Sequence, residues 1–508
     1  MIHAPTITLR PDSDGIFRII AEKHAGLEKL LFHRHPGREW GTFFRFGYRR
    51  TPWGIAFSFV DALAPEAGDL DRQSDIVEFR PAYIQRALKA TGDEHLGIGV
   101  MHSHPFGFGV VPSRLDDDMD TYYGDLLLPY TGNAPYISLI VNRDRAGQFT
   151  FSGRVRDRGQ WFSIHRWIRV GEQQSETFFA ANNLAVADTN SSALSEESTT
   201  ARWLPLIGPQ AHDNLIHATV GVVGCSGTGS PAIEVLARAG VGKFVVVDYQ
   251  RLSPSNLERI HGSLREHYER SPLPQKAQIA AGHIRAINPA VEVTAMVGNI
   301  LDDRVLDELL RCNVVLNCTD TEHARVALGD FANHYLLSAF DVGVLMEGQA
   351  GKISGQVVEF TQYAPGQPCA YCNGRIQQKW LEFELMSETE RASRRAAAHA
   401  AEQQGINGGQ YWAGEPPQLN TVGYITTAAG AMLAGYVIGY LTGAFTMPHS
   451  RFQFDLGMPG LGVVAPHRQR QPQCSCGRSL GYSDQAAAER SISRPRHWPK
   501  PVLVAPAT

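Results

Sequence analysis

Residues 102–118 read HSHPFGFGVVPSRLDDD and gather two imidazoles and several carboxylates in one short segment. His102 and His104 alternate with Ser103, so both face the same side of an extended segment. Asp116 can return as a third ligand from a loop or a helix start. Imidazole and carboxylate suit zinc, whose catalytic sites use three protein ligands and an open water position. The alternative is a solvated polar loop in which the histidines are incidental.

A second segment has the spacing of a phosphate-binding loop. In VGVVGCSGTGSPAIEVLARAGVGKFVVVD, Gly224, Gly227 and Gly229 lie between an expected strand and an expected helix. Glycines there let backbone N–H groups approach a phosphate at the positive end of the helix. Asp248 ends the next strand about 20 residues on, where a carboxylate can bind a ribose hydroxyl. The order G-x-x-G-x-G differs from that of dehydrogenases, although an ordinary dinucleotide-dependent dehydrogenase is the alternative.

Four of the seven cysteines have the spacing of a metal site. An odd count without a secretory signal argues against a disulfide framework. A C-x-x-C pair and a C-x-C pair can complete one tetrahedral zinc site although they are far apart in sequence, and they are Cys369, Cys372, Cys474 and Cys476. Unrelated free thiols are the alternative. Cys225, Cys312 and Cys318 are most simply core residues.

The elements that position these residues form two groups. Up to about residue 170 the chain is rich in aromatic residues and short strand-like runs, and HLGIGVMHSH predicts a buried strand that runs into the histidine loop. From about residue 202, strand and helix patterns alternate, which predicts a mostly parallel sheet. We therefore expect an α/β protein with domains at 1–172 and 202–482, a linker at 173–201 and a disordered tail at 483–508.

Charge and hydropathy exclude several classes of protein. The net charge of −4 gives no basic surface for nucleic acid. The first residues lack the basic and apolar regions of a signal peptide, so we expect a cytoplasmic protein. Residues 424–447 carry no charge and are long enough to cross a bilayer. However, this stretch is rich in Gly, Ala and Thr and lacks flanking Lys/Arg clusters, so we expect a buried helix and no membrane partner.

The histidine segment resembles the motif of the JAB/MPN (JAMM) zinc metallopeptidases, which is an upstream Glu, then His-x-His, then Ser-x-x-Asp. Glu39, His102, His104, Ser113 and Asp116 match it, and the resemblance covers about residues 10–170. It implies a JAB/MPN α/β metallopeptidase domain in which the histidines and the aspartate bind a catalytic zinc. It also implies that the glutamate is the general base and that the serine supports the tetrahedral intermediate.

Two parts of this match leave alternatives open. The loop before the serine is one residue longer than the family pattern, so either of two neighbouring aspartates competes for the metal. Two other glutamates are alternatives to Glu39 as the general base. These alternatives are Asp117 and Asp118 for the ligand, and Glu78 and Glu94 for the base.

The segment VDYQRLSPSNLERIHG resembles the signature of the ThiF/MoeB and ubiquitin-activating adenylyltransferases. Asn256 and Arg259 match its Ser-Asn-Leu-x-Arg, while Lys276 in PQKAQIAAGHIRAINP and Asp320 in NCTDTEHAR match the family lysine and aspartate. The resemblance covers about residues 202–480 and implies a Rossmann-like ThiF adenylation domain. Gln250 departs from the pattern, because the family often has Asp there, but it still offers a hydrogen bond.

This second resemblance also implies roles for the matching residues. Arg259 and Lys276 hold phosphates and stabilise the transition state when a carboxylate attacks the α-phosphate of ATP. Asp320 holds Mg²⁺, which prefers oxygen ligands. Asn256, Asp248 and the glycine loop complete the ATP site, and the four-cysteine cluster resembles the structural zinc of the family. A degenerate, inactive adenylation fold is the alternative.

Together the two resemblances predict a bifunctional enzyme of a bacterial ubiquitin-like modification system. It would adenylate the C-terminal glycine of a ubiquitin-like protein and trim or remove that protein with the zinc peptidase. The expected cofactors are ATP, Mg²⁺ and two zinc ions, one catalytic and one structural. The expected partners are the ubiquitin-like protein, a conjugating-enzyme homologue, and a second copy bound through the adenylation domain. An antiviral defence role rests on analogy with JAB–ThiF fusions alone.

Two other functions fit the same residues. One is the activation and processing of a sulfur-carrier protein in cofactor or cysteine biosynthesis, and the other is a non-enzymatic scaffold for the ubiquitin-like protein. No cysteine lies between Cys372 and Cys474, where related enzymes often carry the cysteine that forms a thioester. The sequence therefore favours adenylation over thioester formation.

Overall fold

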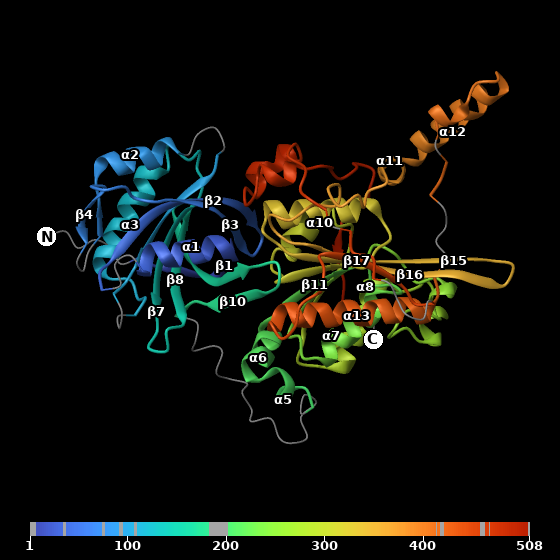
Figure 1. Cartoon of the computed structure of the whole chain (residues 1–508), viewed down its shortest axis with the longest axis horizontal. Helices are drawn as coiled ribbons and strands as arrows, with labels where there is room; N and C mark the ends of the chain where they lie inside the picture. Colours follow the sequence, from blue (N-terminus) through green and yellow to red (C-terminus); the bar gives the residue numbers. More distant parts are fainter. Residues whose placement is uncertain are drawn as a thin grey trace. The chain divides into compact units, whose positions relative to one another are not determined.

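The structure, a computed structural model, describes residues 7–33, 37–73, 77–90, 95–105, 109–181, 202–412, 414–416, 421–457, 463–466 and 468–505 (Figure 1). The chain divides into two compact units. Unit 1 consists of Met1–Ala201, Asn333–Leu337 and Arg478–Glu489, and unit 2 consists of Arg202–Ala332, Ser338–Gly477 and Arg490–Thr508. Each unit therefore includes segments from distant parts of the chain.

Unit 1 is built around a closed, seven-stranded mixed barrel. Its strands follow one another in the order β1, β3, β2, β6, β7, β8 and β9, and β1 pairs in parallel with β9 to close it. These strands are β1 (Leu9–Ile20), β2 (Trp40–Thr51), β3 (Gly54–Leu63), β6 (Gly97–Ser103), β7 (Tyr136–Arg143), β8 (Phe149–Asp157) and β9 (Gln160–Val170). This barrel does not by itself identify the JAB/MPN fold that we expected for residues 1–172, and that assignment stays a prediction.

Short elements cover the barrel. They are helices α1 (Ala21–Glu28), α2 (Pro81–Lys89) and α3 (Arg114–Leu127), the π-helix η1 (Lys29–His33), and the hairpin of β4 (Leu70–Gln73) and β5 (Val77–Phe79). The expected aromatic-rich strands form the core, because residues of period two point inward along each strand. Fully buried members include Phe17, Phe44, Phe57, Phe151 and Trp167.

Strand β10 (Ser175–Phe179) pairs with β9 within the region that we expected to be a linker. That expectation was wrong for these residues, because they pair in antiparallel register with β9, from Ser175 opposite Val170 to Phe179 opposite Arg166. The remainder of the expected linker, residues 182–201, lies outside the described residues.

A segment near the end of the chain, Arg478–Glu489, belongs to unit 1, and we call it the C-terminal strap. Its Ser483 forms a parallel bridge with Tyr48 of β2. The backbone N–H of Tyr48 donates to Gln485 Oε1 at 2.8 Å, and Arg49 donates to the Asp484 carboxylate at 3.1 Å. The strap therefore contributes hydrogen bonds near the C-terminal end of β2.

Unit 2 contains an eight-stranded sheet in the order β17, β16, β15, β14, β11, β12, β13 and β18. The five strands from β15 to β13 are parallel, whereas β16, β17 and β18 pair antiparallel at the two ends. The strands are β11 (Thr219–Val223), β12 (Lys243–Val247), β13 (Glu292–Val297), β14 (Val314–Asn317), β15 (Ala339–Gln349), β16 (Lys352–Tyr363), β17 (Arg451–Asp455) and β18 (Val502–Leu503). The expected mostly parallel α/β sheet is confirmed.

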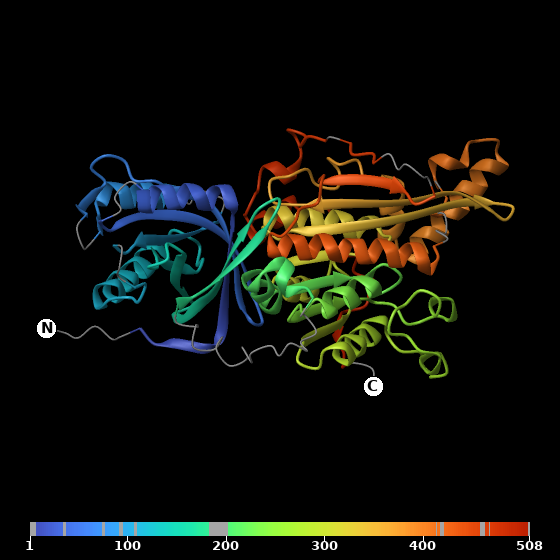
Figure 2. The same ribbon diagram turned by 60° about the horizontal axis from the view of Figure 1, so that its bottom comes forward.

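The helices of unit 2 alternate with the strands from β11 to β15, precede β11, or follow one another between β16 and β17. They are α5 (Leu204–Ile207), α6 (Pro209–His217), α7 (Gly229–Arg238), α8 (Lys276–Ile287), α9 (Asp303–Leu309), α10 (Glu322–His334), α11 (Gln378–Leu385), α12 (Glu388–Gln403) and α13 (Gly423–Thr442). Short 3₁₀ turns are η4 (Pro254–Asn256), η5 (Arg265–Tyr268), η6 (Gly408–Gln410), η7 (Ser475–Gly477) and, in the strap, η8 (Asp484–Glu489). Figures 1 and 2 show α12 and the long β15–β16 hairpin extending away from the rest of unit 2.

Helix α13 is the uncharged stretch identified in the sequence. It is long and apolar enough to cross a membrane by length and composition, and 61% of its most apolar window is buried in this structure. It packs beside α7 and α6 and over β15 and β16 (Figure 2). Leu433 and Val437 lie in the main hydrophobic core of unit 2. The helix therefore has the packing that we expected of a core helix.

The expected disordered tail was wrong for residues 483–505. Residues 484–489 form η8 in the strap, and β18 pairs with β13 through Met296–Leu503 and Val297–Val502. Ser491 also donates its backbone N–H and its hydroxyl to the Asp330 carboxylate, each at 2.9 Å. The proline-rich composition suggested disorder, but pairing with partners far away in sequence fixes this segment.

Candidate functional sites

A cavity of about 1030 Å³ opens at the carboxyl ends of the parallel strands of unit 2. This is the edge of an open α/β sheet where ligands usually bind. Seven of the eight residues that the sequence assigned to the ATP site line it: Gly224, Gly227, Asp248, Asn256, Arg259, Lys276 and Asp320. The eighth, Gly229, is the first residue of α7.

The glycine loop is shaped by contacts inside the protein. Gly224 has a positive φ of 92°, and a Cβ there would lie 2.8 Å from the backbone carbon of Cys318. A Cβ on Gly229 would lie 1.8 Å from the Gly224 carbonyl oxygen. Any larger residue at these two positions would push the loop away from the sheet. Both glycines are therefore needed to form the tight turn between β11 and α7.

Asp248 ties this loop to the end of β12. Its two carboxylate oxygens accept the backbone N–H groups of Cys225 at 2.9 Å and of Gln250 at 2.8 Å. Burial raises the pKa of Asp248, although the charge of Lys276 opposes that shift. The residue expected to bind a ribose hydroxyl thus also holds the phosphate-binding loop in place.

Gln250, the departure from the family pattern, contacts the expected phosphate-binding lysine. Lys276 Nζ donates to Gln250 Oε1 at 2.6 Å, and the Lys276 backbone N–H donates to the Gln250 carbonyl at 2.9 Å. Lys276 starts α8 and is 5% exposed. A neutral amide therefore orients the lysine without neutralising its charge.

Asn256 and Arg259 are held by the loop that follows β12. Asn256 Oδ1 accepts the Ser253 backbone N–H at 2.9 Å and so caps η4. Arg259 donates to the Thr421 carbonyl at 2.8 Å and to its hydroxyl at 3.3 Å. Both side chains line the cavity, and each is already oriented by a protein contact.

Asp320 follows β14 and is exposed within the cavity lining. Its charge is one of the causes, after burial, that raise the pKa of Asp248. Two carboxylates that repel one another across a polar cavity suit a divalent cation with oxygen ligands, as the expected Mg²⁺ site requires.

A charged network that the sequence analysis missed lies beside the cavity, and its members Arg325, Glu359 and Arg375 line it. Buried Asp341 on β15 accepts from Asn317 at 2.7 Å and from the guanidiniums of Arg325 and Arg375 at 3.4 and 3.3 Å. Arg375 also donates to Glu359 at 2.7 Å. The network joins α10, the three strands β14, β15 and β16, and the segment before α11, so no local motif could reveal it.

A second unforeseen contact lies at the start of α10. The Glu384 carboxylate, on α11, accepts the backbone N–H groups of Glu322 and His323, each at 2.9 Å. It also pairs with His323 Nδ1 at 2.8 Å. A carboxylate at the positive end of a helix is stabilised by the helix dipole, so Glu384 fixes α11 beside the cavity.

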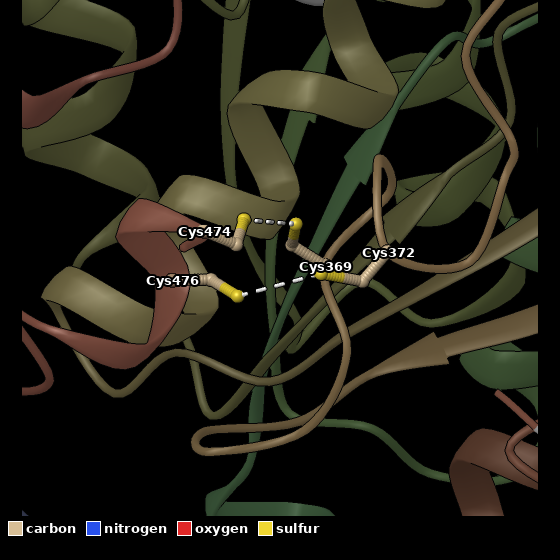
Figure 3. Close-up of side chains that lie close together, drawn as sticks. All are labelled: Cys369, Cys372, Cys474 and Cys476. Carbon is tan, nitrogen blue, oxygen red and sulfur yellow. Dashed lines mark hydrogen bonds between the residues drawn. The ribbon is translucent and has the colours of Figure 1, made fainter. Parts of the chain in front are cut away.

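The four expected zinc-binding cysteines meet in unit 2 (Figure 3). Cys369 and Cys474 sulfurs lie 3.5 Å apart, and those of Cys372 and Cys476 lie 3.9 Å apart. A tetrahedral zinc with Zn–S bonds of about 2.3 Å requires sulfurs about 3.8 Å apart. All four lie within 4.8 Å of one another. The Gln471 backbone N–H donates to Cys372 Sγ at 3.3 Å, which suits a thiolate ligand. The cluster therefore fits a structural zinc.

We expect Cys369→Ser to release about one equivalent of zinc and to lower the melting temperature of unit 2, because a structural metal contributes directly to folding. Metal analysis and thermal unfolding of the full chain measure both effects. Cys312→Ser is the matched control, since Cys312 is buried outside the cluster. Zinc content and melting temperature that are both unchanged in Cys369→Ser would contradict the Cys₄ site.

The remaining cysteines have the properties expected of core residues. Cys225, Cys312 and Cys318 are 1%, 0% and 6% exposed. Burial raises the pKa of the Cys225 and Cys318 thiols, which disfavours the thiolate that a thioester-forming nucleophile needs.

The expected ligands of the first zinc also meet, within unit 1. His102 ends strand β6, His104 follows it, and Asp116 lies in the first turn of α3. His102 Nε2 lies 3.2 Å from Asp116 Oδ1, and one ligand atom from each of the three residues lies within 4.8 Å of the others. Nδ1 of His104 pairs with the Gly109 carbonyl at 2.6 Å, which leaves Nε2 for a metal. The donor set fits a three-ligand zinc site.

Two carboxylates, Asp116 and Glu39, place negative charge near His102. Burial lowers the pKa of His102, but the hydrogen bond and charge of Asp116 and then the charge of Glu39 raise it overall. Glu39 immediately precedes β2, where Trp40 pairs with Ser103. That register places Glu39 beside the end of β6. Glu78 is exposed on β5, and Glu94 lies outside the described residues. Of the two candidate bases within the described residues, Glu39 is the one beside the end of β6.

Ser113 and Asp116 form a capping box at the start of α3. The Asp116 carboxylate accepts the Ser113 backbone N–H at 2.5 Å, and Ser113 Oγ accepts the Asp116 backbone N–H at 3.3 Å. Ser113 therefore fixes the position of the Asp116 carboxylate. Asp117, an expected competitor for the metal, is instead paired with Arg154.

The open parallel sheet with a polar cavity at its carboxyl edge defines unit 2 as a Rossmann-like α/β unit. The chain belongs to the ThiF family, whose model matches residues 198–476. These residues fall mainly in unit 2, and the match gives no support to the peptidase assignment of unit 1.

Curated proteins similar to this chain have related names. The SAMP-activating enzyme E1 of Haloferax volcanii is 32% identical over 33% of this chain and 57% of that protein. The adenylyltransferase and sulfurtransferase MOCS3 of Mus musculus is 33% identical over 33% of this chain and 34% of that protein. The molybdopterin-synthase adenylyltransferase of Salmonella typhimurium is 31% identical over 33% of this chain and 63% of that protein. The chain thus spans between 34% and 63% of the length of these relatives.

Among solved structures, E. coli MccB with ATP aligns at 17% identity with a TM-score of 0.40. The alignment covers 55% of this chain and 73% of that chain.

Proposed function

We propose that unit 2 uses ATP and Mg²⁺ to adenylate the C-terminal carboxylate of a ubiquitin-like or sulfur-carrier protein. The observation that carries the proposal is the meeting of the glycine loop, Asp248, Arg259, Lys276 and Asp320 around one cavity. The names of the curated relatives, which include SAMP-activating and molybdopterin-synthase adenylyltransferase enzymes, support the same reaction.

In this reaction, a carboxylate oxygen of the partner attacks the α-phosphorus of ATP. The bond to the bridging oxygen of the β-phosphate breaks, and pyrophosphate leaves with that electron pair. Lys276, oriented by Gln250, and Arg259, held by Thr421, supply positive charge that is already in place as negative charge develops. Asp320 would hold Mg²⁺ beside the leaving group. The product is an acyl-adenylate on the partner.

ATP–pyrophosphate exchange tests this proposal. The full chain should catalyse exchange only when a ubiquitin-like protein ending in glycine is added. The same protein with an amidated C-terminus is the matched control, because it has no carboxylate to attack the phosphate. Exchange that proceeds equally with the amidated protein, or that never occurs with any glycine-terminated candidate, would contradict the proposal.

We further propose that unit 1 is a zinc peptidase that processes or removes the same protein. The His102, His104 and Asp116 cluster supports this second activity. When bound, zinc would supply a water of lowered pKa, toward about 7, and a Lewis acid for the scissile carbonyl. Glu39 would take the proton of that water and pass it to the leaving amine. Ser113 fixes the aspartate ligand through the capping box.

The two activities favour a modification system in which one protein is both activated and removed. Sulfur-carrier activation is the alternative. One similar protein, from Thermus thermophilus, is named a sulfur carrier protein adenylyltransferase, and MOCS3 is named an adenylyltransferase and sulfurtransferase. The two functions differ in the nucleophile that attacks the acyl-adenylate. An amine acceptor would indicate conjugation, whereas release as a thiocarboxylate by a sulfur donor would indicate sulfur transfer. Dimerisation through unit 2 and a cytoplasmic location stay part of the proposal.

A further inference from the structure

Three consecutive aspartates, Asp116, Asp117 and Asp118, lie near the start of α3, and the structure gives each a different environment. Asp116 faces His102, and Asp118 lies at the helix surface. Asp117 and Asp120 share a single partner on the barrel, Arg154 of β8. Residues three apart on a helix lie on one face, so one side chain can reach both.

The contacts of Arg154 are buried and directional. Its side chain is 8% exposed, and Nε donates to Asp120 Oδ2 at 2.5 Å while an Nη donates to Asp117 Oδ1. Tyr136 on β7 donates its hydroxyl to the other Asp120 oxygen at 2.9 Å. The planar guanidinium fork permits few alternative arrangements of the two carboxylates. The start of α3 is therefore anchored to two strands of the barrel.

We propose that Arg154 is a positioning residue of the unit 1 metal site, and this inference rests on the proposed zinc site. Successive helical residues are rotated by about 100°, so anchoring Asp117 and Asp120 sets the direction of Asp116. The same contacts engage the Asp117 carboxylate and keep it from competing for the metal. Arg154 thus both aims one aspartate at the histidines and removes its neighbour from the ligand set.

Zinc affinity of the full chain tests this role. The relevant zinc is the equivalent that is present in the wild type and absent from His104→Ala, which separates it from the cysteine-bound zinc. Arg154→Met keeps the length of the side chain but removes the fork. We expect a competing chelator to extract this zinc at about 10- to 100-fold lower concentration, as when other outer contacts of metal ligands are lost.

Arg156→Met is the matched control. Arg156 lies two residues further along β8 and pairs with Asp125 at the other end of α3, at 2.6 Å. Its loss removes a contact between the same strand and helix, far along the helix from Asp116. We expect unchanged zinc affinity in Arg156→Met. An equal loss of affinity in both variants would overturn the specific role of Arg154.

A second variant separates positioning from stability. Arg154→Met leaves Asp120, which is 4% exposed, without its counter-ion, and this lowers the melting temperature. Adding Asp120→Asn removes that buried charge, so Arg154→Met/Asp120→Asn should regain much of the melting temperature. Its zinc affinity should stay low, because the anchor is still missing. Zinc affinity that returns together with stability would overturn the inference.

Failure of the inference and failure of the zinc site are distinguishable. A wild-type chain with no zinc equivalent dependent on His104 would contradict the proposed metal site itself. A wild-type chain that holds this zinc, with an Arg154→Met variant that holds it equally tightly, would overturn only the positioning role.

Discussion

Pyrophosphate exchange dependent on the ubiquitin-like partner should fall by about 10²–10³-fold in both Asp320→Ala and Arg259→Ala, because each removes a group that stabilises developing charge. Asp320→Ala removes the expected Mg²⁺ ligand, and raising the Mg²⁺ concentration should recover part of its rate. Arg259→Ala removes a positive charge that Mg²⁺ does not replace, so its rate should not recover. Initial rates at several Mg²⁺ concentrations measure both effects.

Two exposed residues of unit 2 outside the cavity lining provide the controls. Asp213→Ala and Arg265→Ala remove the same charges from the surface, so their exchange rates should match the wild type. Peptidase activity, where it is measured, should persist in all four variants. Normal exchange in both Asp320→Ala and Arg259→Ala would reject the adenylation site.

His104→Ala should abolish cleavage of a fusion to the C-terminus of the ubiquitin-like protein. It should also reduce zinc by about one equivalent per chain, because three protein ligands become two. Adenylation should be retained, since His104 belongs to unit 1 and the ATP cavity to unit 2. Metal analysis, a cleavage assay and pyrophosphate exchange on the same preparation measure the three effects.

His95→Asn is the control for this variant. His95 is an exposed histidine of unit 1 with a positive φ of 54°, and Asn tolerates that conformation. Zinc content and cleavage should be unchanged in His95→Asn. Cleavage that survives in His104→Ala would show that the histidine cluster is not the catalytic metal site.

Local patterns were enough to predict the sheet of unit 2 and seven of the residues that line its cavity. Gly224 and Gly229 are needed because the backbone crowds them, and Asp248 follows a buried strand, so their spacing reports the turn directly. His102 and His104 face the same side because side chains alternate along an extended segment, which is also a local property. The two cysteine pairs are distant in sequence, but each pair has the short spacing of zinc ligands, so the sequence was enough to group all four.

Features made by distant pairing could not be predicted. Asp341, Arg325 and Arg375 meet across a strand, a helix and a loop, and each looks like an ordinary charged residue in its own segment. Closure of the barrel depends on the pairing of β1 with β9, and nothing in the sequence of either strand indicates that the other is its partner. The sequence does not distinguish Arg154 from the other arginines. Its contacts with Asp117 and Asp120 follow only from the packing of α3 against β8.

The C-terminal strap makes the order of synthesis matter for unit 1. Tyr48 and Gln485 are 437 residues apart, so the strap leaves the ribosome long after β2. At roughly 5–20 residues per second, that delay is about 20–90 s. During this time Tyr48 and Arg49 lack their hydrogen-bond partners in the strap, Gln485 and Asp484. A single proteolytic cut in the chain between residues 181 and 202 would leave the strap covalently attached to the C-terminal fragment. The strap would then be held to the barrel by non-covalent contacts alone.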